Sequence, residues 1–184
     1  MNTLFATYSG KLINFKDIDV DLICLEDIAH HLTQECRFGG SLPLGIRFSV
    51  ASHSLNCFQI ARTMCSDDED IQRLALMHDA TEAYLRDIPS GLKSCIPDYK
   101  KIETHLHEII AYKYNLLICD SIVEEIDKRI FLNEVLSFVP SKYDLYYNNQ
   151  DFEPYDGLRF YPDKYPSLIK NIFLDTCKEV GIHD

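Results

Sequence analysis

Residues 74–90 read LALMHDATEAYLRDIPS, a stretch in which ionisable side chains interrupt an apolar helical pattern. Apolar residues recur at helical spacing up to His78, so the pattern predicts a helix in which His78 takes a position where leucine would be expected. Asp79 follows directly, and Glu82 lies one turn beyond His78 on the same face. The helix is expected to end before Pro89, because the residue preceding a proline disfavours helical geometry.

This group of one imidazole and two carboxylates is costly to bury unless something compensates it. A bound cation is the simplest compensation. A hydrogen-bonded core histidine with solvated acids nearby is the alternative, and this stretch alone does not separate the two, since the chain has seven histidines and 29 acidic residues.

The composition predicts one globular domain, with 46% hydrophobic and 26% charged residues in 184 positions. The net charge of −11 argues against broad binding to nucleic acid or anionic membranes, because no basic stripe is present to meet phosphates. No apolar run approaches the roughly 20 residues of a membrane span, and the first residues lack the pattern of a signal peptide. We therefore expect a cytoplasmic protein without a membrane or nucleic-acid partner.

The cysteines are odd in number and include no Cys-x-x-Cys pair. We expect them to be reduced core cysteines and neither a disulfide framework nor a zinc site. They are Cys24, Cys36, Cys57, Cys65, Cys95, Cys119 and Cys177.

The apolar periodicity predicts an all-α fold of five or six core helices. The expected helices begin near residues 25, 48, 71, 98, 121 and 166, and an acidic connector at 66–70 is expected to cap the third of them. The core spans about 20–138, and 139–184 is expected to be a C-terminal extension of the same domain. Its aromatic-rich, proline-containing part, to about residue 165, predicts an irregular wrap over the core.

Three of these helices carry ionisable side chains in or beside an apolar stripe. The residues are His53, His78 with Asp79, and Asp127. Two imidazoles and two carboxylates form a mixed nitrogen and oxygen donor set, which suits a divalent transition ion such as Mn²⁺, Co²⁺, Fe²⁺, Ni²⁺ or Zn²⁺. The all-oxygen cage that Ca²⁺ prefers is absent from this set.

The order of these residues matches the H…HD…D signature, and the chain resembles the HD-domain phosphohydrolases. More narrowly, it is similar to the small bacterial and phage branch that contains 5′-deoxynucleotidases and phage deoxyadenosine-triphosphate triphosphohydrolases. The resemblance covers about residues 8–138 and rests on these segments: LEDIAH (25–30), RFGG (37–40), FSVASHS (48–54), HDATEAYL (78–85), DIPS (87–90), Lys93 and DKR (127–129). Arg86 departs from the pattern, since relatives usually have glycine there.

The resemblance also implies roles for single residues. The metal ligands would be His53, His78, Asp79 and Asp127, with Mg²⁺ a further candidate ion when substrate is bound. The acid/base pair would be Glu82 and Asp87. Phosphate-binding groups would be Arg37 and Lys93, and Phe38 would lie near the sugar.

The expected function is metal-dependent hydrolysis of the 5′-phosphoester of a deoxynucleotide, which releases phosphate from a dNMP or triphosphate from a dNTP. Extra basic groups would be needed for a triphosphate, and Arg47, Arg62, Arg86, Lys100 and Lys101 are the candidates. The alternatives are a phosphodiesterase for a cyclic or signalling nucleotide, a di-iron oxygenase of the same fold, and a catalytically silent nucleotide sensor. Proteins of the family that the chain resembles often dimerise, so the aromatic C-terminal segment is a candidate homo-oligomer interface. If the protein is encoded by a phage, it would act in the host cytoplasm.

Overall fold

The computed structural model describes residues 4–147 and 151–184 and confirms the all-α prediction. Most of the described chain is helical, and the small exception is an antiparallel hairpin of β1 (Leu4–Ala6) and β2 (Leu12–Asn14) near the N-terminus. The helices are α1 (Leu25–Gln34), α2 (Val50–Met64), α3 (Glu69–Met77), α4 (Glu82–Leu85), α5 (Ser90–Lys93), α6 (Pro97–Tyr114), α7 (Ser121–Phe138), α8 (Tyr143–Tyr147) and α9 (Pro166–Glu179). Short 3₁₀ turns lie at Val20–Leu22 (η1), Arg37–Gly40 (η2) and Pro140–Lys142 (η3).

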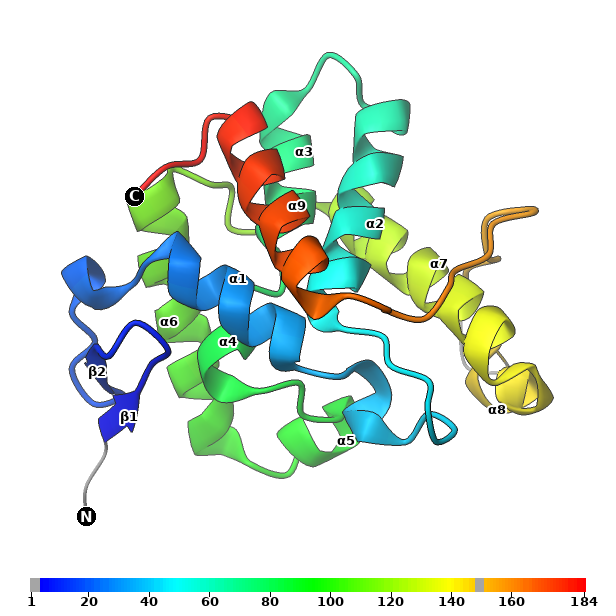
Figure 1. The fold of residues 1–184 in the computed structure, drawn as a ribbon, viewed down its shortest axis with the longest axis horizontal. Coiled ribbons are helices and arrows are strands. Elements are labelled where there is room, and N and C mark those ends of the chain that lie inside the picture. Colours follow the sequence, from blue (N-terminus) through cyan, green and yellow to red (C-terminus); the bar gives the residue numbers. More distant parts are fainter. Residues whose placement is uncertain (1–3, 148–150) are drawn as a thin grey trace.

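Helix α2 lies at the centre of the bundle and packs against α1, α3, α7 and α9 (Figure 1). One apolar cluster joins α1, α2, α6 and α9, and a second joins α2, α3 and α7. The two clusters share α2 as a wall, so a polar side chain on this helix is buried between them. His53 is such a side chain, with none of its surface exposed.

The long helix predicted through residues 71–86 is interrupted, and that part of the prediction is wrong. Helix α3 ends at Met77, and α4 begins at Glu82. Between them the backbone amides bond three residues back: Ala80 to Met77, Glu82 to Asp79 and Tyr84 to Thr81, at 2.9–3.0 Å. These tighter turns rotate the following side chains relative to a continuous α-helix. Asp68 accepts a hydrogen bond from the amide of Ile71 at 3.1 Å, so the predicted acidic cap of α3 is confirmed.

The C-terminal extension contains α8 and α9, and residues 151–165 between them have no helix or strand. Tyr155 and Phe160 of this segment pack against the apolar cluster of α2, α3 and α7, as the prediction of an aromatic wrap required, whereas Tyr161 and Tyr165 are exposed. Asp163 accepts hydrogen bonds from the amide of Ser49 at 2.9 Å and the hydroxyl of Ser52 at 2.6 Å. The wrap therefore caps the N-terminus of α2, one turn from His53.

All seven cysteines are free thiols, and the prediction that they form no disulfides is confirmed. Cys24, Cys57 and Cys177 are buried, but Cys95 and Cys119 are exposed, so the prediction that the cysteines are core residues is wrong for these two. Both lie in connections between helices, where the local apolar composition does not imply burial. Within the described ranges, every helix is too short or too polar to cross a membrane.

Candidate metal centre

Two histidines from different helices point their Nε2 atoms at each other. His53 comes from α2 and His78 from the turn after α3, and these two atoms are 3.3 Å apart. The Nδ1 of His53 donates to Oε1 of Glu134 at 2.6 Å, and the Nδ1 of His78 donates to the carbonyl of Ala75 at 2.9 Å. With Nδ1 protonated, a neutral imidazole has its lone pair on Nε2, so two lone pairs would face one point at which a cation can bind.

Two carboxylates face the same point. Oδ1 of Asp127, on α7, is 3.0 Å from the Nε2 of His53, and Oδ2 of Asp79 is 3.3 Å from the Nε2 of His78 and 3.7 Å from that of His53. Nitrogen and oxygen ligands of one ion at about 2.0–2.2 Å lie about 3.0–3.6 Å from one another. The separations found here therefore fit a single divalent ion, and the chain can bind a metal at this centre. The assignment of each residue as a ligand stays a prediction.

Glu134 was not among the predicted site residues, although it supports two of them. It is fully buried on α7, and its second oxygen accepts a hydrogen bond from the Nε of Arg37 at 3.3 Å. The sequence signal was available, because Glu134 lies seven residues after Asp127 and therefore on the same helical face, within the apolar run FLNEVL at 131–136.

The charges of the centre are strongly coupled. Burial alone would lower the pKa of His78, but Asp79 outweighs that effect and raises it to about 10. Burial likewise opposes the low pKa of Asp79, which the imidazoles of His78 and His53 nevertheless hold below its ordinary value. Without a metal ion, protons on the imidazoles therefore balance the negative charge of the carboxylates. A bound metal would replace that charge, as expected for a site whose ligands must be deprotonated.

Glu82 and Asp87, the predicted acid/base pair, lie beside the centre. Burial and the nearby carboxylates of Asp79 and Asp87 hold the pKa of Glu82 well above its usual range. Burial also raises the pKa of Asp87, despite the opposing charge of Arg37. Oε2 of Glu82 is buried and has no hydrogen-bond partner within the described residues. A buried carboxyl with an unpartnered oxygen is available to a bound molecule.

The two predicted phosphate-binding groups each lie close to a carboxylate of this region. Nη1 of Arg37 is 3.9 Å from Oδ2 of Asp79, and Nζ of Lys93 is 3.7 Å from Oε1 of Glu82. A second carboxyl, that of Glu103 on α6, accepts a hydrogen bond from Nζ of Lys93 at 2.7 Å. Glu103 was not predicted, and it orients Lys93 toward the centre.

Phe38 follows Arg37 in the η2 turn. Its ring stacks on that of Phe131, with centroids 5.6 Å apart, and it does not line the cavities described below. Its φ of 60° and ψ of 24° place the backbone in the left-handed region, which a bulky residue rarely adopts. Its contact with a sugar therefore stays a prediction.

Two adjoining cavities open beside the metal centre. A polar cavity of about 230 Å³ is bordered by Asp79, Glu82 and Lys93 among others, and a less polar one of about 160 Å³ includes Leu74 and Val123 in its wall. His78, His107 and Ile118 line both. The arrangement can accept a ligand with a charged end in the first cavity and an apolar part in the second.

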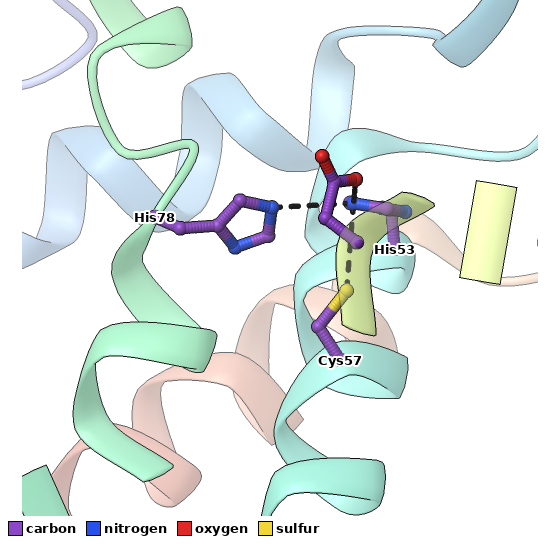
Figure 2. Close-up of side chains that lie close together, drawn as sticks. His53, Cys57 and His78 are labelled. Atoms are coloured by element: carbon purple, nitrogen blue, oxygen red, sulfur yellow. Dashed lines mark hydrogen bonds and ion pairs between the residues drawn. The ribbon is translucent and has the colours of Figure 1, made fainter. Parts of the chain in front are cut away.

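Cys57 also borders the centre, which its prediction as a core cysteine did not include. Its Sγ is 3.5 Å from the Nε2 of His53, and Figure 2 shows both side chains with His78 around one point. One donor atom from each of His53, Cys57, His78 and Asp127 lies within 4.8 Å of the others.

Comparison with protein-family models finds no match. The uncharacterized protein YfdR of Escherichia coli K12 is 42% identical over 114 residues, which are 62% of this chain and 60% of that protein. An uncharacterized protein of Rhodobacter capsulatus is 31% identical over 110 residues, 59% of this chain and 56% of that protein. The matched region thus spans about three fifths of the length of these curated relatives, and their descriptions assign no activity.

Proposed function

We propose that this chain is a metal-dependent phosphohydrolase of the HD-domain type that hydrolyses the 5′-phosphoester of deoxynucleoside monophosphates. The observation that carries the proposal is the convergence of His53, His78, Asp79 and Asp127 from three separate segments, with donor separations of 3.0–3.7 Å. The flanking motifs of the sequence, in the order of the HD family, support the same reaction class.

The metal is needed for electrostatic reasons as well. Six carboxyl groups surround the centre, at positions 79, 82, 87, 103, 127 and 134, against two cationic groups, Arg37 and Lys93. The ionised carboxylates among them would repel a phosphate group unless a cation were added. When bound, a divalent ion supplies Lewis acidity, which lowers the pKa of water and polarises a phosphoryl oxygen.

The residues around that ion have complementary roles. Hydrolysis adds water across the bond between phosphorus and O5′, so hydroxide goes to phosphorus and a proton to O5′. Burial and the neighbouring carboxylates favour the protonated form of Glu82, which would give that proton to O5′. Arg37 and Lys93 would neutralise the charge that develops on the phosphoryl oxygens.

The distribution of basic residues favours one phosphate group over three. None of Arg47, Arg62, Arg86, Lys100 and Lys101 lines either cavity beside His78. Arg62 pairs with Glu179 at 2.7 Å and Arg86 with Glu35 at 3.2 Å. Lys100 and Lys101 border the next hollow along α6, so they are the candidates if a triphosphate is used instead.

A di-iron oxygenase is less well supported, because it needs additional histidine ligands and three of the four candidates, His30, His31 and His105, have other contacts; the fourth, His107, lines both cavities beside His78. His30 stacks on Tyr8 with centroids 3.6 Å apart, and His31 accepts a hydrogen bond from the amide of Tyr8. His105 lies 4.0 Å from Glu108 on the surface of α6.

The proposal is tested by measuring phosphate and triphosphate release from dNMPs, NMPs, dNTPs and NTPs with Co²⁺, Mn²⁺, Zn²⁺ and Mg²⁺. We expect phosphate from dNMPs, and loss of both bound ion and activity in Asp127→Ala, Asp79→Ala and His53→Ala with helical content retained. Glu125→Ala, a half-buried position on α7 that pairs with Arg129 and lies two residues from Asp127, is the matched control and should keep both. Triphosphate release from dNTPs would change the substrate, whereas a metal-loaded protein that hydrolyses no nucleotide would contradict the proposal.

A further inference from the structure

We infer that Cys57 Sγ is a further ligand of the metal centre, and that the centre therefore selects a thiophilic divalent ion such as Zn²⁺ or Co²⁺ over Mg²⁺ and Mn²⁺. The inference rests on the metal centre of the proposed function but does not depend on which nucleotide is hydrolysed. It assigns to Cys57 a role that neither the H…HD…D signature nor the core prediction for this cysteine includes.

The position of Cys57 on α2 brings its sulfur to the ion. Cys57 follows His53 by four residues, so the two side chains emerge one turn apart on the same face of the helix. Sγ is 3.5 Å from the Nε2 of His53. A nitrogen at about 2.0–2.1 Å and a sulfur at about 2.3 Å from one zinc ion lie about 3.1–3.6 Å apart, depending on the coordination angle.

The same relation extends to the other donors. Sγ of Cys57, the imidazole nitrogens of His53 and His78 and a carboxylate oxygen of Asp127 lie within 4.8 Å of one another. They come from three elements, α2, the turn after α3, and α7, so they surround a point and are not a row along one helix (Figure 2). Together with the carboxylate of Asp79, these donors would supply two nitrogens, two oxygens and one sulfur, a mixed set that zinc and cobalt accept.

The burial of Cys57 indicates which side of the ion the sulfur occupies. Cys57 has no exposed surface, and its other neighbours in the core are apolar, including Ala61, Leu74 and Ile126. Sulfur would therefore bind from the apolar floor. Asp79, by contrast, borders the open polar cavity and also faces Arg37 at 3.9 Å. Asp79 would thus provide an oxygen ligand on the side of the cavity, and Cys57 a sulfur ligand on the side of the apolar core.

This donor set predicts the choice of ion. Mg²⁺ and Ca²⁺ prefer sites made of oxygen, whereas a thiolate favours softer ions. The purified protein should bind Zn²⁺, Co²⁺ or Cd²⁺ more tightly than Mg²⁺ or Mn²⁺. Replacing Cys57 by serine should weaken Zn²⁺ binding by at least the roughly 10- to 100-fold that loss of a supporting residue costs, because a direct ligand is lost, with much less effect on Mn²⁺.

The test is titration of the metal-free, reduced protein with Cd²⁺, monitored by the ultraviolet charge-transfer absorption of a cadmium–thiolate bond. We expect one Cd²⁺ per chain with this absorption in the unmodified protein and in Cys119→Ser, and its loss in Cys57→Ser. Cys119 is the matched control, because it is an exposed cysteine that borders the cavity next to His78. X-ray absorption of the zinc-loaded, unmodified protein is a second measurement that needs no variant, and it should show one sulfur neighbour at about 2.3 Å.

The outcomes separate this inference from the proposed function. A stoichiometric ion without a sulfur neighbour, or an absorption that persists fully in Cys57→Ser, would overturn the role of Cys57 and leave the phosphohydrolase proposal intact. An unmodified protein that binds no divalent ion would overturn both. If the protein hydrolyses nucleotides and Cys57→Ser keeps the cadmium–thiolate absorption, the role of Cys57 is overturned and the proposed function stands.

Discussion

Nδ1 of His53 donates a hydrogen bond to the buried carboxyl of Glu134 across 2.6 Å, which leaves the Nε2 of His53 facing His78 and Asp127. The same carboxyl accepts a hydrogen bond from Arg37 at 3.3 Å. Glu134 therefore fixes the orientation of a predicted metal ligand and of a predicted phosphate-binding group together. Burial of a carboxyl is tolerated because both oxygens have partners.

Glu134→Gln should weaken metal binding by about 10- to 100-fold, the usual effect of removing a partner that orients a ligating histidine. The amide still accepts one hydrogen bond, but its NH₂ group meets the N–H of Arg37 or His53, so we also expect a loss of stability of about 1–3 kcal/mol. Competition with a chromophoric chelator measures the affinity, and the ¹⁵N shifts of His53 report its tautomer. Unchanged affinity in a folded variant would show that Glu134 is only structural.

Glu82→Gln tests the proton-transfer role. The variant has the same size, keeps the metal ligands and cannot donate an acidic proton, so turnover of the best nucleotide substrate should fall by about 10²- to 10⁴-fold. Metal content and substrate Kd should stay within a few-fold of the unmodified protein. If Glu82→Gln loses its ion instead, Glu82 supports the metal and does not transfer the proton.

Asp27 gives a prediction about stability that is independent of the metal centre. Its fully buried carboxylate accepts hydrogen bonds from the amide and hydroxyl of Ser9, both at 2.7 Å, and from the thiol of Cys24 at 3.2 Å. Burial opposes the charged form, but these hydrogen bonds outweigh it and hold the pKa of Asp27 below its ordinary 3.8. The N-terminal hairpin is thereby attached to α1.

A carboxylate with a depressed pKa in the folded state contributes stability that is present above its unfolded pKa and lost as the pH falls through the folded value. Asp27→Asn should cost about 1–3 kcal/mol at pH 7, and the difference from the unmodified protein should shrink as the pH falls below about 4. Urea denaturation between pH 7 and pH 3.5 measures both, with Asp17→Asn, an exposed position, as the control. A difference that is constant with pH would contradict the role of the charge.

The resemblance to the HD-domain phosphohydrolases implies glycine at the position of Arg86, and the backbone of Arg86 has a conformation that suits glycine. Its φ of 74° and ψ of 156° lie in a region that is essentially restricted to glycine. Arg86→Gly should relieve strain of about 1–3 kcal/mol, offset in part by the extra freedom of glycine in the unfolded chain and by the loss of a half-exposed pair with Glu35, worth about 0–1 kcal/mol. We expect a net gain in unfolding free energy, measured by urea denaturation.

Arg86→Ala is the matched control, because it removes the pair with Glu35 and keeps the strain. The glycine variant should be the more stable of the two. Equal stability of Arg86→Gly and Arg86→Ala would show that the backbone at this position is not strained in solution.

Much of the fold follows from apolar periodicity, and the bounds of α6 and α7 agree with it to within a residue. The interruption of the helix at His78 does not follow from periodicity. The hydrogen bonds from each amide to the carbonyl three residues earlier, between Met77 and Tyr84, leave the apolar pattern of the sequence unchanged. His53, His78 and Asp127 could be chosen from the sequence because each interrupts an apolar stripe. Their convergence follows from packing, which periodicity alone does not give.

The roles of Glu134 and Cys57 depend more heavily on tertiary structure. Glu134 acquires its partners from residues 81 and 97 positions away in the chain, His53 and Arg37. Cys57 occupies an apolar position that a thiol satisfies without any ligand. Only the approach of α7 and the α3 turn to α2 brings these two side chains to a group of donors.

Phe38 provides the final prediction, which concerns the sugar. The ring follows Arg37, and its left-handed backbone is a conformation that the adjacent glycines would adopt without strain, so the side chain is kept at a cost. A ring against C2′ would leave a ribose 2′-hydroxyl without a hydrogen-bond partner, at about 1–3 kcal/mol or roughly ten- to a hundred-fold in kcat/KM. The unmodified protein should therefore prefer dAMP to AMP, and Phe38→Ala should lose that preference.

Phe131→Ala, which removes the stacking partner 5.6 Å away, is the matched control and should lower stability but keep the preference. Loss of selectivity in both variants, or in neither, would assign Phe38 to packing, and equal use of dAMP and AMP by the unmodified protein would contradict the prediction directly.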